Sequence, residues 1–359
     1  MIRYGLIGSG MMGQEHIRNI LMQDGAVITG ISDPDEGMRT AAVAMSGGKG
    51  FADWREMVSA DVADAYVIAS PNDTHHGVLL DLLPANKPIL VEKPLCTTSA
   101  HCREAIAVAQ GRTAPTWVAM EYRYMPPIQR MVQELSTGVA GKAQMVSIRE
   151  HRFPFLDKVD DWNRFSRRTG GTLVEKCCHF WDLMRLLVQD DPVRVYASAA
   201  RDVNHAGERY DGETPDIIDN AFVVVEFAGG VRGCLDLCMF AEGATWQERI
   251  SVTGSKARIE AHIPSNEATK ADGAPDAYVS IADRANGETR IDVPVDAKIL
   301  AAGSHHGSTF YQHQRFAELV RSGTGEPDVT LEDGLWSVRI GEAAELSALE
   351  RRAVEMAEI

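Results

Sequence analysis

A glycine pattern near the start of the chain restricts the fold more than any other feature of the sequence. The apolar run Tyr4–Ile7 predicts a buried strand, and three glycines spaced as G-x-G-x-x-G follow it, at Gly8, Gly10 and Gly13. In a strand-turn-helix unit, the first glycine permits a tight turn, the second lets the backbone approach a pyrophosphate, and the third lets the helix pack closely on the strand. The pattern therefore predicts a unit that binds a dinucleotide.

Residues that follow this pattern support the prediction. The helix would begin at Met11 and Met12, with its positive N-terminal end directed at the phosphates. A second apolar run, Ala26–Ile31, leads to Asp33, which lies about 20 residues beyond the last glycine. An acidic residue at that distance accepts hydrogen bonds from an adenosine ribose.

Two acidic residues favour NAD over NADP as the cofactor. Asp33 and Asp35 would repel the 2′-phosphate that distinguishes NADP. Arg39 is close enough in the sequence to weaken this discrimination. The sequence thus predicts that NAD is bound in preference to NADP. The strictness of this preference depends on Arg39.

The remaining sequence predicts two domains of different architecture. Through the first 120 residues, strand-like apolar runs alternate with helical stretches, which is typical of a doubly wound parallel sheet of the Rossmann type. From about Gln144, longer strands separated by turns indicate a large, mostly antiparallel sheet with one open face. We therefore expect an α/β protein with a dinucleotide-binding domain at residues 1–122 and an α+β domain for substrate binding and oligomerisation at residues 123–359. Further expected elements are a helix near Gly171–Val188, a surface excursion at Pro264–Gly287 and an amphipathic helix at Leu331–Met356.

Charge and composition exclude several classes of protein. The 359 residues carry a formal net charge of −15, which argues against a nucleic-acid partner or an anionic membrane surface because both need clustered positive charge. No apolar stretch approaches the roughly 20 residues that cross a bilayer, and the chain opens directly on the first strand, so we expect no signal peptide. The six cysteines form no C-x-x-C pair. These features predict a cytoplasmic enzyme with reduced thiols.

A Glu-Lys-Pro tripeptide, Glu92-Lys93-Pro94, follows the fourth apolar run of the first domain. Lys93 would therefore lie at the carboxyl edge of the parallel sheet, where ligands bind. Pro94 restricts the backbone of Lys93 to an extended conformation and so limits the direction of its side chain. An isolated tripeptide of this kind is usually a surface turn, but its place at a strand end favours a role in the site.

A second group of reactive side chains lies in the segment Thr169–Asp182. Glu175 and His179 are four residues apart, which places them on one face of a helix. A carboxylate that orients one imidazole nitrogen leaves the other free to remove a proton from a hydroxyl. Spacing alone favours a simple hydrogen bond on the helix surface. Glu175, Cys178 and His179 could also bind a metal, but no spaced ligand set accompanies them, and we expect none.

The whole chain resembles the glucose-fructose oxidoreductase, inositol dehydrogenase and MocA family of nicotinamide-dependent oxidoreductases, over both expected domains. The residues that carry the resemblance are Gly8, Gly10 and Gly13 with Asp33, the Ser70–His75 loop, Glu92-Lys93-Pro94, Tyr122-Arg123-Tyr124 with Pro126, Gly170–His179 with Asp182, Asp219-Asn220, and Gly254-Ser255-Lys256.

The resemblance implies a set of catalytic and cofactor-binding residues. Lys93 and His179 would flank the reacting carbinol carbon, with Glu175 one helical turn before the histidine. The family more often has Asp in place of Glu175 and a third glycine in place of Thr172, so Glu175 would either orient His179 or hold a substrate hydroxyl itself. The implied cofactor-binding residues are Gly8, Gly10, Met11, Met12, Gly13, Asp33, Ser70, Asn72, His75, Glu92, Lys93 and Arg123.

A segment with several basic residues precedes the expected catalytic helix. Between Arg149 and Arg168, six basic residues are interspersed with four acids, which is typical of a solvated loop of mixed charge. Alternatively, one or two of the arginines bind an anionic group on a sugar, for which the planar guanidinium is suited. The candidate substrate-binding residues are Arg152, Trp162, Arg164, Arg168, Glu175, His179, His306 and Tyr311.

Three classes of function remain compatible with the sequence. The first is an NAD-dependent dehydrogenase acting on a sugar, sugar acid or cyclitol, and the second is a glycosidase of the same fold that oxidises, eliminates and reduces its substrate. The third is a dinucleotide sensor without catalysis, against which the presence of both Lys93 and His179 argues. The strand Ala221–Phe227 is apolar at successive positions, so we also expect a homodimer or homotetramer that covers the second face of its sheet.

Overall fold

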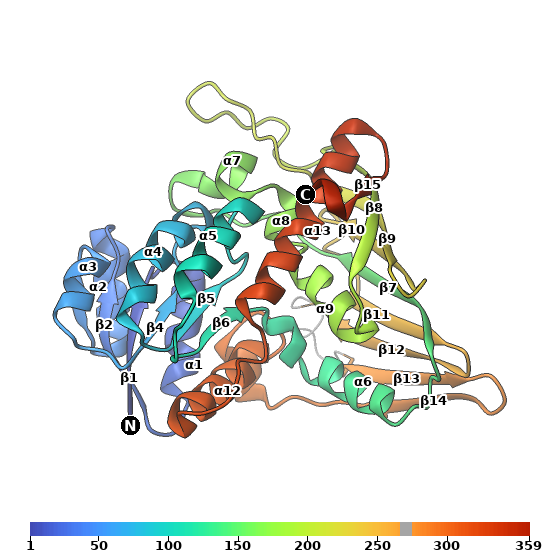
Figure 1. Ribbon diagram of the computed structural model, residues 1–359, viewed down its shortest axis with the longest axis horizontal. Helices are drawn as coiled ribbons and strands as arrows, with labels where there is room; N and C mark the ends of the chain where they lie inside the picture. Colours follow the sequence, from blue (N-terminus) through green and yellow to red (C-terminus); the bar gives the residue numbers. More distant parts are fainter. Residues whose placement is uncertain (266–274) are drawn as a thin grey trace. The chain divides into compact units, whose positions relative to one another are not determined.

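The computed structural model describes residues 1–265 and 275–359 (Figure 1). The chain folds into two compact units, and the expected division at residue 122 into a dinucleotide-binding domain and a domain for substrate binding and oligomerisation stays a prediction. The first unit consists of Met1–Glu121, Lys158–Trp162 and Ala297–Val338, and the second consists of Tyr122–Asp157, Asn163–Asp296 and Arg339–Ile359.

The first unit is built on a six-stranded parallel sheet with the order β3-β2-β1-β4-β5-β6. The chain starts at β1, moves outward to β3, returns to β4 beside β1 and continues to β6. This reversal between β1 and β4 confirms the predicted doubly wound sheet. The strands are β1 (Ile2–Ile7), β2 (Ala26–Ser32), β3 (Lys49–Phe51), β4 (Ala65–Ile68), β5 (Ile89–Glu92) and β6 (Thr116–Ala119).

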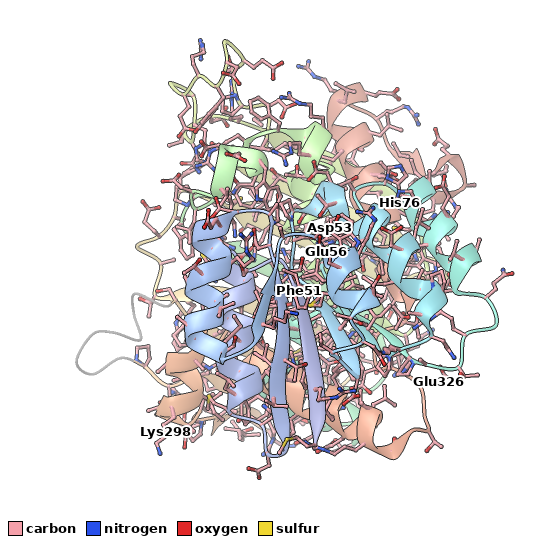
Figure 2. The ribbon with its side chains drawn as sticks, turned by 90° about the vertical axis from the view of Figure 1, so that its left-hand side faces the viewer. Phe51, Asp53, Glu56, His76, Lys298 and Glu326 are labelled. Carbon is pink, nitrogen blue, oxygen red and sulfur yellow. The ribbon has the colours of Figure 1, made fainter. Side chains whose placement is uncertain are left out.

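Helices of the first unit pack on this sheet, and every residue of β4, β5 and β6 is buried. This explains why these strands are short and apolar without alternation. Figure 2 shows Phe51 at the end of β3, with Asp53 and Glu56 where α3 begins. A late segment, α12, packs beside α1 and β1 (Figure 1). The helices are α1 (Met11–Leu21), α2 (Glu36–Ser46), α3 (Trp54–Ser59), α4 (His75–Leu82), α5 (Ser99–Ala109), α11 (Ala297–Ala302) and α12 (Ser308–Ser322).

The second unit contains a nine-stranded sheet with the order β14-β13-β12-β11-β7-β10-β9-β8-β15. β10 and β7 are parallel and the other neighbours are antiparallel, which confirms the predicted mostly antiparallel sheet. The strands are β7 (Ala143–His151), β8 (Pro192–Ala200), β9 (Asn220–Phe227), β10 (Arg232–Cys238), β11 (Trp246–Gly254), β12 (Ala257–Pro264), β13 (Tyr278–Asp283), β14 (Gly287–Asp292) and β15 (Val354–Glu355).

Helices cover one face of this sheet. α6 packs on β12 and β13, and α9 packs on β7 (Figure 1). The opposite face carries apolar side chains in neighbouring strands, among them Tyr196, Phe222 and Val224, and the side chain of Phe222 is 68% exposed. The sheet is therefore open-faced, as the sequence predicts. The helices are α6 (Pro126–Ser136), α7 (Ser166–Thr169), α8 (Thr172–Glu175) and α9 (Cys178–Val188), while α13 (Leu331–Glu350) starts in the first unit and ends in the second.

Three expected elements differ from the structure. The helix expected near Gly171–Val188 is interrupted between α8 and α9, where Lys176 and Cys177 form a turn. The helix expected to reach Met356 ends at Glu350, because Arg351 adopts a left-handed φ of 56° and the chain then pairs with β8 as β15. Part of the expected excursion at Pro264–Gly287 lies outside the described residues, and its remainder contains β13, an ordinary strand of the sheet.

Residues 1–265 and 275–359 lack the features of a membrane span and of a metal centre. Among these residues, no helix is long and apolar enough to span a bilayer. The same residues contain no group of three or more His, Cys, Asp or Glu side chains arranged to hold a metal ion. All six cysteines are free thiols.

Candidate cofactor site and catalytic residues

The glycine turn after β1 has the geometry that the sequence pattern predicts. Gly8 has a φ of 88°, and a Cβ placed there would lie 2.5 Å from the carbonyl oxygen of Ala69. A Cβ on Gly13 would lie 2.3 Å from the carbonyl oxygen of Gly8. A Cβ on Gly10 would meet no atom within 4 Å, so open space lies beside the backbone at the start of α1. Gly8 and Gly13 must therefore be glycines, because a side chain at either position would clash with neighbouring backbone. The absence of a side chain at Gly10 leaves space for a ligand beside the N-terminus of α1.

The N-terminus of α1 is suited to hold a pyrophosphate. The N-cap residue Gly10 provides no side-chain hydrogen bond, and the first intrahelical bond runs from Gln14 N to Gly10 O. The N–H groups of Met11 and Met12 belong to the first turn, where helix N–H groups have no intrahelical partner and the dipole favours an anion. These features fit the phosphates of a dinucleotide.

Asp33 follows β2 at the carboxyl edge of the sheet and is buried. One of its carboxylate oxygens accepts hydrogen bonds from Ser9 N at 2.7 Å and Ser9 Oγ at 2.9 Å, and the other accepts from Asp35 N at 2.9 Å. Arg39 donates to the backbone carbonyl of Asp33 at 2.6 Å. The carboxylate of Asp33 is therefore held beside the glycine turn. The guanidinium of Arg39 binds a backbone carbonyl and not this carboxylate.

The loop after β4 is joined to the Glu-Lys-Pro segment by His75. The imidazole is buried, with Nδ1 2.9 Å from Pro94 O and Nε2 3.0 Å from Ser70 O. Burial lowers the pKa of His75, although the two carbonyl contacts oppose the shift. Asn72 is also buried in this loop. His75 thus holds the two loops together, and direct contact of Ser70, Asn72 or His75 with the cofactor stays a prediction.

Lys93 begins the loop after β5, and its backbone position is tied to its neighbour. The carboxylate of Glu92 accepts from Lys93 N at 3.1 Å and from His16 Nε2 at 2.8 Å. His16, on α1, in turn has its Nδ1 2.7 Å from Nε2 of His313, on α12. His16 was not predicted from the sequence, and His313, which the sequence offers as a candidate for a wall that binds substrate hydroxyls, contacts His16 in the structure. The signal available for His16 is a histidine three residues after Gly13, on the helix that follows the glycine turn.

The second unit holds the other two predicted catalytic residues. Glu175 ends α8 and His179 lies in the first turn of α9, and both are nearly fully buried. The turn between them means that they do not share the face of one continuous helix. The ring of Tyr122 stacks on the imidazole of His179, with centroids 4.1 Å apart and an interplanar angle of 9°.

A buried polar cluster lies next to this stack and was not predicted from the sequence. Lys176 Nζ donates to Tyr122 OH at 2.7 Å and forms an ion pair with Glu150 Oε1 at 2.9 Å. Burial lowers the pKa of Lys176, opposed by the charge of Glu150. Burial and the charge of Glu150 raise the pKa of Glu248, on the neighbouring strand, to about 7. The cluster joins the α8–α9 turn to β7 and β11.

The predicted arginines have different partners. Arg123 and Asp182 form a bidentate ion pair with two contacts of 2.6 Å, so Arg123 is held within the second unit. Arg164 is buried and pairs with Asp157 at 2.7 Å and Glu208 at 3.1 Å. Arg152 lies 3.6 Å from Glu150, and its guanidinium also lies over the ring of Phe153. Arg168 lies on the short helix α7 and is half-buried.

The predicted substrate-binding residues divide between the two units. Trp162, His306 and Tyr311 belong to the first unit, whereas Arg152, Arg164, Arg168, Glu175 and His179 belong to the second. His306 is buried, which lowers its pKa to about 4. The joint action of the two sets stays a prediction.

Two family models match the chain. One is described as oxidoreductase family, NAD-binding Rossmann fold, and matches residues 2–120. The other is described as oxidoreductase family, C-terminal alpha/beta domain, and matches residues 132–356. The two matches together account for most of the sequence.

Individual proteins show the same likeness over long alignments. The myo-inositol 2-dehydrogenase of Thermotoga maritima is 25% identical over 365 residues, which cover 100% of this chain and 99% of that protein. Inositol 2-dehydrogenase 2 of Paenarthrobacter aurescens is 34% identical over 248 residues, or 67% of this chain and 70% of that protein. The solved structure of a levoglucosan dehydrogenase with NADH and levoglucosan has a TM-score of 0.81 at 18% identity, with 99% of each chain covered, and so shows the same fold.

Proposed function

The chain belongs to the glucose-fructose oxidoreductase, inositol dehydrogenase and MocA family, and we propose that it transfers hydride between NAD and a secondary hydroxyl of a cyclitol or sugar. The protein is an NAD-binding oxidoreductase, so the proposal concerns the substrate and the residues that act on it. The observation that carries it is the position of Lys93. This lysine begins the loop at the carboxyl end of β5, in a sheet whose glycine turn fits a dinucleotide.

In the proposed reaction, the carbinol C–H bond breaks as its O–H proton is removed, and a carbonyl forms. Bound NAD supplies the hydride acceptor. His179 accepts the hydroxyl proton as general base, and Lys93 stabilises the negative charge that develops on the oxygen. Glu175 either orients His179 or holds a neighbouring hydroxyl of the substrate.

The structure supports these roles within each unit. His179 is held on one ring face by Tyr122, which limits its rotation. The backbone N–H of Lys93 donates to Glu92, whose carboxylate is held by His16. A general base and a cationic side chain need fixed geometry to contribute their full effect. Joint action of Lys93 and His179 on one carbon is part of the proposal.

The names of the relatives indicate where to look for the substrate. Two are inositol 2-dehydrogenases, so myo-inositol is the first compound to test, followed by other polyols, aldoses, uronic acids and glycosides. The assay records NADH formation and, for glycosides, aglycone release. NADH formation with a cyclitol or sugar supports the proposal, and Lys93→Ala and His179→Ala should each lower turnover by roughly 100-fold or more while retaining NAD affinity. Near-normal turnover in either variant would remove that residue from the mechanism.

The same assay separates the two competing functions. Aglycone release without net NADH would identify a glycosidase in which NAD is regenerated in each cycle. Binding of NAD with no turnover of any compound in the panel would favour a dinucleotide sensor. We further propose a cytoplasmic location, supported by the six free thiols, and a homo-oligomer, supported by the apolar open face of the second sheet.

A further inference from the structure

Two carboxylates lie at the ends of neighbouring strands in the parallel sheet. Glu92 is the last residue of β5, and Glu121 follows β6 by two residues. β5 and β6 pair in parallel, with Glu92 opposite Ala119. Both acids therefore lie at the carboxyl edge of the sheet, and their exposed fractions are only 5% and 1%. This is the edge at which doubly wound sheets bind their ligands.

Glu92 is kept ionised by a histidine pair. Burial acts to raise the pKa of Glu92, but the hydrogen bond from His16 and its charge outweigh this effect, and the pKa lies below its ordinary value. Burial holds the pKa of His313 well below its ordinary value, so this ring is neutral. A neutral His313 can accept at Nε2 from the Nδ1–H of His16, so that both ring nitrogens of His16 donate, Nδ1 to His313 and Nε2 to Glu92. The negative charge of Glu92 is thus built into the fold by α1 and α12.

Glu121 adds a second negative charge that depends on pH. Its burial, followed by the charge of Glu92, raises its pKa to about 7, while His305 and Lys93 act in the opposite direction. His305 Nε2 lies 4.0 Å from Glu121, and its Nδ1 lies 3.1 Å from Glu15 of α1. The carboxylates of the group are Glu15, Glu92 and Glu121, and its basic side chains are Lys93, His16 and His305, so ionisation of Glu121 near pH 7 adds one negative charge to it.

The nicotinamide half of the cofactor belongs on this side of the sheet. Asp33, which marks the adenosine side, follows β2. The strand order places β4, β5 and β6 on the other side of β1, where the second half of a dinucleotide binds in a doubly wound sheet. The oxidised nicotinamide ring carries a positive charge that the reduced ring lacks. A fixed negative charge in a site of low dielectric constant therefore interacts differently with the two forms.

We propose that Glu92 and Glu121 select the oxidised form of the cofactor, so that the protein binds NAD⁺ more tightly relative to NADH than it would without these charges. The inference rests on NAD binding and extends the proposed function, because a site that favours NAD⁺ is loaded for oxidation of the substrate hydroxyl. Glu92 contributes to the preference for NAD⁺ over NADH at every pH of the test. The contribution of Glu121 to this preference grows as its carboxyl group ionises.

The test measures binding of both cofactor forms and needs no substrate. Dissociation constants for NAD⁺ and NADH are measured by calorimetry at pH 6 and pH 8.5 for the unmodified protein and for Glu121→Gln. In the unmodified protein, the ratio of the NADH constant to the NAD⁺ constant should rise with pH. In Glu121→Gln, the ratio at pH 8.5 should fall by about tenfold, the size expected when one charge is removed from a site of low effective dielectric constant.

A matched control removes a charge elsewhere in the same unit. Glu56 is exposed on α3, which packs on β2 and β3 at the opposite side of the sheet (Figure 2). Glu56→Gln should leave both constants and their pH dependence unchanged. The ratio of the two constants should also depend less on pH in Glu121→Gln than in the unmodified protein, which identifies Glu121 as the titrating group.

The outcomes separate this inference from the proposed function. An unchanged ratio in Glu121→Gln at pH 8.5, or a ratio in the unmodified protein that does not vary with pH, would overturn the selection of NAD⁺ whatever the substrate is. A shifted ratio without turnover of any cyclitol or sugar would support the selection and contradict the proposed dehydrogenase. Failure of both cofactor forms to bind would overturn the inference together with the cofactor assignment.

Discussion

The phenol ring of Tyr122 lies parallel to the imidazole of His179, at a centroid separation of 4.1 Å. The hydroxyl of Tyr122 accepts a hydrogen bond from Lys176 and lies 3.4 Å from Glu248. One face of the imidazole is therefore covered by a ring whose own position is held by a buried polar cluster. This arrangement predicts that the cluster acts on catalysis through the orientation of His179.

The first prediction separates the stack from the hydrogen bonds. Tyr122→Leu should lower kcat by about tenfold, because the energy of an aromatic pair is about 1 kcal/mol and the imidazole gains freedom to rotate. Tyr122→Phe keeps the ring and should retain most of the activity. The kcat values of the two variants are compared by steady-state kinetics with a substrate that the unmodified protein oxidises. Calorimetry then checks that both variants still bind NAD. Equal losses in the two variants would assign the effect to the hydroxyl and Lys176 instead.

The second prediction concerns cofactor choice. Asp33→Ala should narrow the preference for NAD over NADP, because the variant loses both the repulsion of a 2′-phosphate and the acceptor for the ribose hydroxyl. Arg39 donates to the carbonyl of Asp33, so it is not committed to a carboxylate and can approach a phosphate in the variant. Calorimetric titration with both nucleotides provides the measurement. Equal or tighter binding of NADP by the unmodified protein would contradict the prediction.

The glycine turn and the position of Asp33 could be predicted because their signals are local. Gly8, Gly13 and Asp33 have their roles within one strand-turn-helix-strand segment, and each is required by a contact that the spacing already implies. Sequence spacing carries this information because regular elements convert it into position.

The rest of the site depends on contacts between distant segments. His16 meets His313 from a separation of 297 residues, and Tyr122 meets Glu248 from a separation of 126. Lys176 looks like an ordinary surface residue in the sequence, yet the turn between α8 and α9 directs it into the interior. Hydrophobic periodicity predicts that elements exist, but it does not reveal which polar residues of different elements will meet.

The third prediction concerns assembly through the open face of the second sheet. The exposed apolar side chains of that face, with Phe222 at its most exposed point, should be covered by another copy of the chain. Phe222→Glu should therefore lower the molar mass measured by light scattering at micromolar concentration. Leu349→Glu, at an exposed leucine of α13, is the matched control and should leave the mass unchanged. A monomeric unmodified protein would refute the prediction.

The fourth prediction concerns the stability of the first unit. Burial acts to raise the pKa of Glu15, but His305, Thr309 and Ser304 outweigh it and lower the pKa to about 2. Because the folded-state pKa is depressed, the stabilisation is present above the unfolded value of about 4.5 and is lost as the pH falls toward 2. Glu15→Gln should lower the free energy of unfolding by about 2 kcal/mol at pH 7. Urea unfolding should show this difference shrinking below pH 4.5, and a constant difference would contradict the linkage.

The fifth prediction concerns the charge of the substrate. Arg164 is already paired with Asp157 and Glu208, so its guanidinium is less suited to bind an anionic group than that of Arg152, whose nearest carboxylate contact with Glu150 is 3.6 Å. If Arg152 is the anchor, an anionic sugar should have a higher kcat/KM than its neutral analogue, and added salt should reduce the advantage.

The substitution Arg152→Lys tests the geometry of this anchor. It keeps the charge but removes the planar fork, so the advantage of the anionic sugar should fall while turnover of the neutral analogue changes little. Arg167→Lys, at an exposed arginine paired with Glu213, serves as the control. Equal kcat/KM values for charged and neutral sugars at low salt would mean that Arg152 supports Glu150 and the Lys176 cluster and that the substrate is a neutral polyol or sugar.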